Sequence, residues 1–337
     1  MNKRSLLPVL STALLAPAFL AGQVYAEEAT TPAESSAVVA TPATSATPAP
    51  VESPAVPETS ATSEAVVPAE TPSAPAESTK SEEKDTVILH TNDVHGRIVE
   101  EKGVIGDAKL ATVIEQERAK SNQNTLVVDA GDAFQGLPIS NSTKGEARAE
   151  ILNQMQYDAM AVGNHEFDFG LDEVKKYKEI LKFPLLSSNT YVNGARLFEA
   201  STIVDKDKTV EGDEFVVIGV ITPETATKTH PKNVKGVTFT DPISEVNKVI
   251  EEVQAKARAE GKDYKHYVVL AHLGVDTTTP VEWRGSTLAE ALSKNPRLKG
   301  KRVTVIDGHS HTVESTTYGD NVTSVSYTHL TLPTTPY

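Results

Sequence analysis

Short apolar runs that alternate with longer amphipathic stretches limit the fold of this chain more than any other feature. Seven runs have the length and composition of buried strands: 86–90, 125–129, 159–162, 185–187, 215–220, 266–271 and 303–306. Between them, apolar residues recur at helical spacing in 107–120, 146–155, 171–182 and 286–294. The clearest helix follows Asp241, where Pro242 suits a first turn. This order predicts an α/β layered domain.

The first quarter of the chain has a different composition from the rest. Lys3 and Arg4 precede an apolar stretch at 6–20, and Ala26 ends a short segment suited to signal peptidase. We therefore predict a cleaved signal peptide at 1–26, with a retained membrane anchor as the alternative. Residues 27–84 are rich in Pro, Ala, Thr, Ser and Glu and contain no aromatic residue, which predicts a disordered stalk. The folded domain is expected at 85–324.

Net charge and the absence of cysteine exclude several classes of function. The formal net charge is -14, which argues against general binding to nucleic acid polymers or to anionic membranes. The chain has no cysteine, so disulfides, thiolate metal sites and cysteine nucleophiles are excluded. Any metal must be held by His, Asp, Asn or similar residues. After signal cleavage we expect no stable insertion into a membrane.

Five short polar motifs follow the predicted strands. They are Thr-Asn-Asp-Val-His at 91–95, Gly-Asp at 131–132, Gly-Asn-His-Glu at 163–166, Ala-His at 271–272 and Gly-His-Ser-His at 308–311. Asp-x-His or Gly-Asp alone could be an ordinary loop or turn. Together the motifs supply the carboxylate, amide and imidazole ligands that a pair of divalent metal ions needs. Because layered α/β proteins bind ligands beyond strand C-termini, one pocket could collect all five, as in a dinuclear metallohydrolase.

The motifs belong to longer runs with a family resemblance. The runs are Ile-Leu-His-Thr-Asn-Asp-Val-His-Gly at 88–96, Asp-Ala-Gly-Asp at 129–132, Ala-Val-Gly-Asn-His-Glu-Phe-Asp-Phe-Gly at 161–170 and Ile-Gly-Val-Ile-Thr-Pro-Glu at 218–224. With the two later histidine motifs, they closely resemble the 5'-nucleotidase/UDP-sugar hydrolase branch of the calcineurin-like metallophosphoesterases. The resemblance covers about residues 85–318. It implies a layered sandwich of two mixed β-sheets flanked by helices. The signal peptide and stalk further resemble those of cell-surface 5'-nucleotidases of Gram-positive bacteria.

The resemblance also implies a role for each site residue. It assigns the ligands of two divalent metal ions, Zn, Mn or similar: Asp93, His95 and His311 to the first, Asn164, His272 and His309 to the second, and Asp132 to both. His165 would be catalytic and Asp168 would orient it. The chemistry of these groups fits independently, since a free imidazole beside two metal ions can stabilise the transition state or protonate the leaving oxygen.

The function expected from these features is an exported dinuclear-metal phosphohydrolase that releases phosphate from nucleoside 5'-monophosphates or related nucleotides. UDP-sugar hydrolysis and 2',3'-cyclic nucleotide phosphodiesterase activity on the same fold remain alternatives. A surface-displayed binding module without turnover is a third, although it would not need Asp132, His165 and Asp168 together. A stalk of this kind is also compatible with cell-wall attachment.

Several further residues carry separate expectations. Residues 325–337 fit no continuation of the domain, and we interpret them as a non-native read-through tail. The family resemblance implies additional strands and a base-stacking C-terminal domain that this sequence does not contain, so nucleotide affinity should be poor. His90 is predicted to be a structural residue with satisfied hydrogen bonds. Glu166 is interpreted either as a support for the catalytic residues or as a turn carboxylate.

Overall fold

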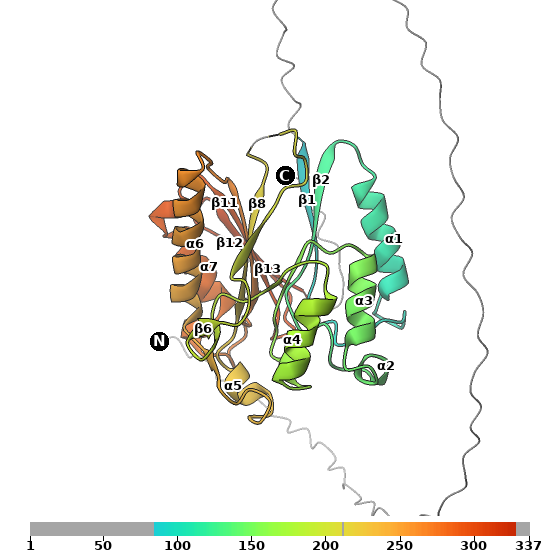
Figure 1. Ribbon diagram of the computed structural model, residues 1–337. Helices are drawn as coiled ribbons and strands as arrows, with labels where there is room; N and C mark the ends of the chain where they lie inside the picture. Colours follow the sequence, from blue (N-terminus) through green and yellow to red (C-terminus); the bar gives the residue numbers. More distant parts are fainter. Residues whose placement is uncertain (1–83, 211, 328–337) are drawn as a thin grey trace, which may run out of the picture. The chain divides into compact units, whose positions relative to one another are not determined.

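The computed structural model describes residues 84–210 and 212–327 (Figure 1). The predicted signal peptide, the predicted stalk up to residue 83 and the chain beyond residue 327 lie outside these residues. Within the described ranges, no helix is both long and apolar enough to cross a membrane.

The first sheet has four parallel strands in the order β1-β2-β3-β4. Their bounds are β1 Asp85–Thr91, β2 Gln123–Asp129, β3 Ala159–Ala161 and β4 Leu185–Leu186. Three helices cover its outer face (Figure 1): α1 Asp107–Arg118, α3 Glu146–Gln154 and α4 Leu171–Ile180. Ile114 of α1 and Leu152 of α3 pack in one buried cluster with Val127 of β2, which fixes these helices on the sheet.

The second sheet has six strands in the order β12-β13-β11-β10-β8-β7. Their bounds are β7 Ser201–Val204, β8 Phe215–Ile221, β10 His266–His272, β11 Arg302–Asp307, β12 Glu314–Tyr318 and β13 Val322–Ser326. The four central strands are parallel and the edge strands β7 and β12 are antiparallel, so this sheet is mixed whereas the first is parallel throughout. Helices α6 (Pro242–Ala259) and α7 (Gly285–Ser293) cover its outer face (Figure 1). As predicted, α6 starts after Asp241, whose side chain accepts a hydrogen bond from the Ser244 N–H.

The inner faces of the two sheets pack against each other. Leu126 and Val128 of β2 share a buried cluster with Val217 of β8 and Leu270 of β10, while Val127 faces the helices on the other side. Successive side chains of a strand point to opposite faces, so strands buried on both faces must be continuously apolar. The predicted layered sandwich is therefore confirmed, with the order helix, sheet, sheet, helix, but only the second of its two main sheets is mixed, whereas two mixed sheets were expected.

The elements that the sequence did not predict are mostly very short. They are β5 Thr190–Val192, β6 Ala195–Arg196, β7, β9 Val237–Phe239, β12, β13, α2 Pro138–Asn141, α5 Thr225–Lys228 and the 3-10 turns His165–Phe167, Val281–Trp283 and Pro296–Leu298. Strands β6, β5 and β9 form a small antiparallel sheet. Two to five residues are too few for a hydrophobic period to emerge from the sequence.

The C-terminal boundary of the folded domain differs from the expected one. Strand β13 continues past Ser324 through Val325 and Ser326, which pair in parallel with Ile306 and Asp307 of β11. Ser326 is buried. These two residues, which we expected to belong to the tail, therefore complete a strand, because the neighbouring strand offers them unpaired backbone groups.

Candidate metal centre

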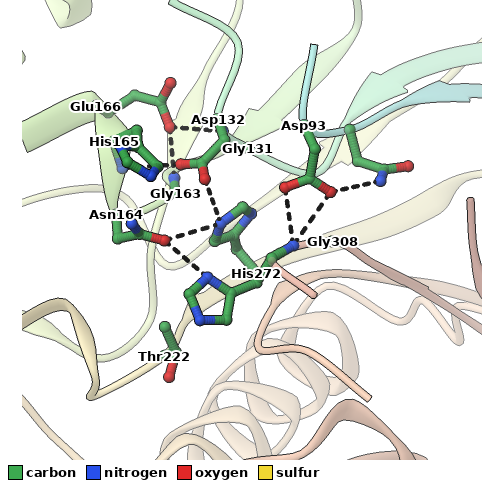
Figure 2. A network of polar contacts seen from close by, with 12 residues as sticks. Asp93, Gly131, Asp132, Gly163, Asn164, His165, Glu166, Thr222, His272 and Gly308 are labelled. Atoms are coloured by element: carbon green, nitrogen blue, oxygen red, sulfur yellow. Dashed lines mark hydrogen bonds and ion pairs between the residues drawn. The ribbon is translucent and has the colours of Figure 1, made fainter. Parts of the chain in front are cut away.

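The polar motifs meet at the C-terminal ends of the parallel strands of both sheets. The loop after β1 lies on the loop after β2, because the Asp93 N–H donates to the Gly131 carbonyl at 2.9 Å and the His95 N–H to the Asp132 carbonyl at 2.9 Å. From the second sheet, His272 ends β10, and the His309 N–H donates to the Asp93 carboxylate at 2.9 Å. Figure 2 shows residues from both sheets facing one another in this centre.

A first group of potential metal ligands comprises Asp93, His95 and His311. One ligand atom of each lies within 4.8 Å of the others. The Nε2 atoms of His95 and His311 are 3.2 Å apart, and the His311 Nε2 is 3.6 Å from Oδ1 of Asp93. Asp93 is fully buried, whereas the His311 side chain is 43% exposed. The three residues predicted for the first metal ion thus lie together at the open side of the centre.

A second group comprises Asp132, His272 and His309, again with ligand atoms within 4.8 Å of one another. Oδ1 of Asn164 lies 3.2 Å from Nε2 of His272 (Figure 2). The same oxygen lies 2.8 Å from Nδ1 of His309. Oδ2 of Asp132 is 3.0 Å from the His272 Nε2 and 4.0 Å from the His95 Nε2. Asp132 therefore stands between the two groups, and all seven predicted ligands lie in one place.

The donor atoms of this centre converge in a way that fits bound cations. The facing Nε2 atoms of His95 and His311 cannot both carry a hydrogen at 3.2 Å, so at least one presents a lone pair to the other. Carboxylate oxygens, an amide oxygen and imidazole nitrogens are suitable ligands for Zn and Mn ions. The residues present thus fit divalent metal ions.

The backbone at the centre is strained. Asp93, His95, Asp132, His309 and His311 all have positive φ, between 49° and 75°, and they are five of the eight described non-glycine residues that do. A side chain costs energy in this left-handed region, and such residues gather at functional sites. Gly163 shows how tight the centre is, since a Cβ there would lie 2.2 Å from Oδ1 of Asp132.

In three of the four ligand histidines, the second ring nitrogen has a defined neighbour. Nδ1 of His95 lies 3.0 Å from the Gln135 carbonyl, and Nδ1 of His272 lies 2.8 Å from the Ala130 carbonyl. A carbonyl accepts only from N–H, so both rings carry their hydrogen on Nδ1 and turn Nε2 toward the centre. His309 has the opposite orientation, with Nδ1 facing Asn164 and Nε2 lying 3.5 Å from Oε2 of Glu224.

His165 lies beside the two groups and is held by Asp168. Nδ1 of the His165 ring is 2.6 Å from Oδ2 of Asp168. The backbone N–H of His165 donates to Oδ1 of Asp132 at 2.8 Å. The ring meets that of His95 edge-on, with the centroids 5.1 Å apart. Burial lowers the pKa of His165, but the hydrogen bond and the charge of Asp168, with the charge of Asp132, outweigh it, so the net pKa is raised. The predicted pair of His165 and Asp168 is therefore in contact.

Opposing pKa shifts reveal the charge balance of the centre. Burial acts to raise the pKa of Asp132, but the adjacent His272 outweighs it and holds this pKa well below the usual range. Burial acts to lower the pKa of His272, and Asp132 overcomes it and raises the value to about 10. Burial and the charge of His272 lower the pKa of His309 to about 3. The carboxylate of Asp132 is therefore ionised and His309 is neutral, the forms in which both can bind a metal ion, whereas Nε2 of His272 carries a proton toward Asp132 that a bound metal ion would replace.

Two buried carboxylates support the ligand loops. Glu166 accepts backbone hydrogen bonds from Asp132 and Gly163 at 2.7–2.8 Å (Figure 2). It also accepts from Ala133 at 2.9 Å and from Phe134 at 3.3 Å. In the sequence, only its place next to His165 indicated this role. Of the two interpretations of Glu166, these contacts favour a support for the catalytic residues over a turn carboxylate.

On the second sheet, Asp307 makes the corresponding contacts. Its Oδ1 accepts from the N–H groups of Leu273, Gly274 and Gly308 at 2.8–3.1 Å, which ties the loop after β10 to the loop after β11. Sequence reasoning missed this residue, because an aspartate at the end of a strand gives no local sign of which amides it meets.

His90 differs from its expected surroundings. We predicted satisfied hydrogen bonds, but both of its ring nitrogens are buried without a hydrogen-bond partner in the described part of the chain. Burial lowers its pKa to about 4, and the Asn92 side chain offsets part of that effect. The expectation was wrong because the period of a strand shows that a side chain is buried but not what it meets. Neither His230 nor His266, for which the sequence indicated no ligand role, belongs to either ligand group.

The sandwich and the two adjoining ligand groups at its strand ends define a metallophosphoesterase domain. Residues 86–313 match the family model described as calcineurin-like phosphoesterase. The chain belongs to the calcineurin-like phosphoesterase family.

Similar proteins include several nucleotidases. A 5'-nucleotidase from Vibrio cholerae is 40% identical over 179 residues, which cover 51% of this chain and 32% of that protein. A snake venom 5'-nucleotidase from Naja atra is 34% identical over 241 residues, 68% of this chain and 41% of that protein. The crystal structure of a 5'-nucleotidase precursor from Thermus thermophilus aligns with a TM-score of 0.54 at 26% identity, covering 72% of this chain and 48% of that one. This chain thus matches about a third to a half of the length of these proteins.

Proposed function

We propose that this domain is a metal-dependent phosphohydrolase that releases phosphate from nucleoside 5'-monophosphates or related nucleotides. The observation that carries the proposal is the position of Asp132 between two groups of ligand atoms. Oδ2 of Asp132 faces both groups, and the lone pairs of one carboxylate oxygen suffice to bridge two metal ions, while Oδ1 accepts from the His165 backbone N–H. The names of the similar proteins, 5'-nucleotidases from a bacterium and a snake venom, support the substrate class.

The proposed ligands divide between two divalent ions, Zn, Mn or similar. The first ion would be held by Asp93, His95 and His311, the second by Asn164, His272 and His309, and both by Asp132. Bound there, two such ions supply activation of a water and neutralisation of charge on the phosphoryl oxygens. The protein holds its imidazoles in the required tautomers through the Ala130 and Gln135 carbonyls.

His165 is proposed as the catalytic residue that protonates the leaving oxygen. Asp168 holds its Nδ1, so the proton on Nε2 is the one available to a substrate. We expect His165→Ala to lower kcat by about 10² to 10⁴ while both metal ions stay bound. Unchanged turnover, or loss of the metal ions, would contradict this role.

The proposal is tested by measuring phosphate release from AMP by the purified full chain, with bound metal counted in the same samples. We expect metal-dependent release that Asp132→Ala abolishes. Asp172→Ala is the matched control, because this carboxylate is fully exposed at the start of α4. Metal binding without phosphate release from any nucleotide would contradict the proposal and favour a binding module.

The same assay separates the related activities. UDP-glucose and 2',3'-cyclic AMP are offered beside AMP at equal concentration, and kcat/KM is compared. The proposal expects AMP to be preferred. A preference for UDP-glucose or for the cyclic nucleotide would assign the alternative activity on the same ligand set.

We further propose that the chain is exported, with a signal peptide at 1–26, a disordered stalk at 27–84 and the catalytic domain from residue 85. The proposal rests on composition, since 27–84 contains no aromatic residue and many prolines. Expression of the full chain followed by N-terminal sequencing tests it. Cleavage after Ala26 and recovery outside the cytoplasm are expected, and an intact cytoplasmic N-terminus would contradict export. Cell-wall attachment would appear as activity that sediments with the wall fraction.

A further inference from the structure

Both carboxylate oxygens of Asp168 are held by side chains. Oδ2 lies 2.6 Å from Nδ1 of His165, and Oδ1 accepts a hydrogen bond of 2.5 Å from the Thr229 hydroxyl. The Asp168 backbone carbonyl accepts a third bond, of 2.7 Å, from the side-chain amide of Asn233. The residue that orients His165 is thus itself fixed at three atoms.

Thr229 and Asn233 lie on the segment that leads from β8 to β9, and this segment is firmly attached. At its start, the Thr222 N–H donates to the His272 carbonyl at 2.8 Å. At its end, Val234 is buried in the core cluster under the first sheet. Thr229 itself is only 5% exposed. Its hydroxyl is therefore delivered to Asp168 by a segment anchored at both ends.

The second hydrogen bond matters because a carboxylate held at one oxygen can still rotate. With Nδ1 of His165 as its only side-chain partner, Asp168 could swing and carry the imidazole with it. The His165 side chain is 34% exposed, so packing against the surrounding protein restrains the ring little. A hydrogen bond to the other oxygen removes this rotation, and a charged acceptor makes such a bond stronger than a neutral one.

We propose that Thr229 is a positioning residue that fixes Asp168, so that Nε2 of His165 points at the leaving oxygen of the substrate. The inference rests on the proposed hydrolase function. In the step concerned, the bond from phosphorus to the leaving oxygen breaks while the attacking water oxygen bonds to phosphorus and releases one proton to solvent, from which His165 is later reprotonated. The proton on Nε2 of His165 passes to the leaving oxygen.

The test compares Thr229→Val with wild type on two substrates. AMP has an alkoxide leaving group that needs a proton, whereas p-nitrophenyl phosphate has a leaving group that is stable as an anion. Valine matches threonine in shape but lacks the hydroxyl. We expect kcat for AMP to fall by about 10- to 100-fold, the range for a misplaced reacting group, while kcat for p-nitrophenyl phosphate stays close to wild type. Thr229→Ser keeps the hydroxyl and should restore most of the activity on AMP.

The controls separate this inference from a structural effect and from the proposed function. Thr238→Val changes an exposed threonine of β9 and should leave both substrates unaffected. Equal losses on both substrates, loss of bound metal, or a serine variant as slow as the valine variant would overturn the positioning role. Full activity of Thr229→Val on AMP would overturn it as well. If wild type itself releases no phosphate from either substrate, the proposed function fails instead.

Discussion

Replacing Glu166 with glutamine should lower the free energy of unfolding by about 2–6 kcal/mol. Each carboxylate oxygen accepts two backbone hydrogen bonds, Oε1 from Ala133 and Phe134, and Oε2 from Asp132 and Gly163. In either orientation, the glutamine amide turns its NH₂ group toward two of these donors. Two buried N–H groups then lose their acceptor, and each costs about 1–3 kcal/mol.

The measurement is urea unfolding followed by circular dichroism at pH 8, for wild type and variant. Burial and the charge of Asp132 raise the pKa of Glu166 to about 7, so at pH 8 the carboxylate accepts at both oxygens. A loss of 2 kcal/mol corresponds to a decrease in Tm of about 4–8 °C for a domain of this size. The variant should still fold, because domains have about 5–15 kcal/mol of stability.

The matched control is Glu179→Gln, the same change at an exposed position of α4, which should stay within about 0.5 kcal/mol of wild type. If Glu166→Gln were equally neutral, the conclusion that this carboxylate ties the Asp132 loop to the Gly163 loop would be refuted.

Three further predictions concern the metal site and its surroundings. Glu224→Ala should weaken metal binding by about 10- to 100-fold, because the carboxylate facing Nε2 of His309 is lost. Competition with a chelating dye measures the metal affinity. An affinity equal to that of the control Glu282→Ala, at an exposed position, would contradict the prediction. His90 should make the fold less stable as pH falls from 6.5 to 4, since below 6.5 the unfolded chain binds a proton that the folded chain, with a pKa of about 4, does not. The decrease in the free energy of unfolding approaches about 3 kcal/mol. His90→Phe should not show this contribution, so an identical pH dependence of the unfolding free energy in wild type and variant would disprove the prediction. Dialysis against a chelator should abolish phosphate release and lower Tm, and Mn²⁺ or Zn²⁺ should restore both; release that persists without metal would argue against a metal-dependent reaction.

The main strands and helices could be predicted from the sequence because they are buried in a regular way. Strand β8 is buried along its whole length, so its run of Phe, Val and Ile appears in the sequence as a continuous apolar segment. Helix α6 carries its start in Asp241 and Pro242. The short antiparallel elements escaped prediction because pairing with a neighbour, and not a local period, creates them. Strand β13 extends to Ser326 for the same reason.

The site divides in the same way between sequence and structure. The sequence by itself determined which ligand types the chain offers and that each follows a strand, because a short polar motif after an apolar run is a local pattern. Only the tertiary structure decided that His309 meets Asp93 across 216 residues, and that Thr229 meets Asp168 across 61. It also decided from which backbone N–H groups the Glu166 carboxylate accepts hydrogen bonds. The physical reason is that such contacts depend on how two sheets and their loops pack, and side-chain partners far apart in the chain leave no periodic trace in the sequence.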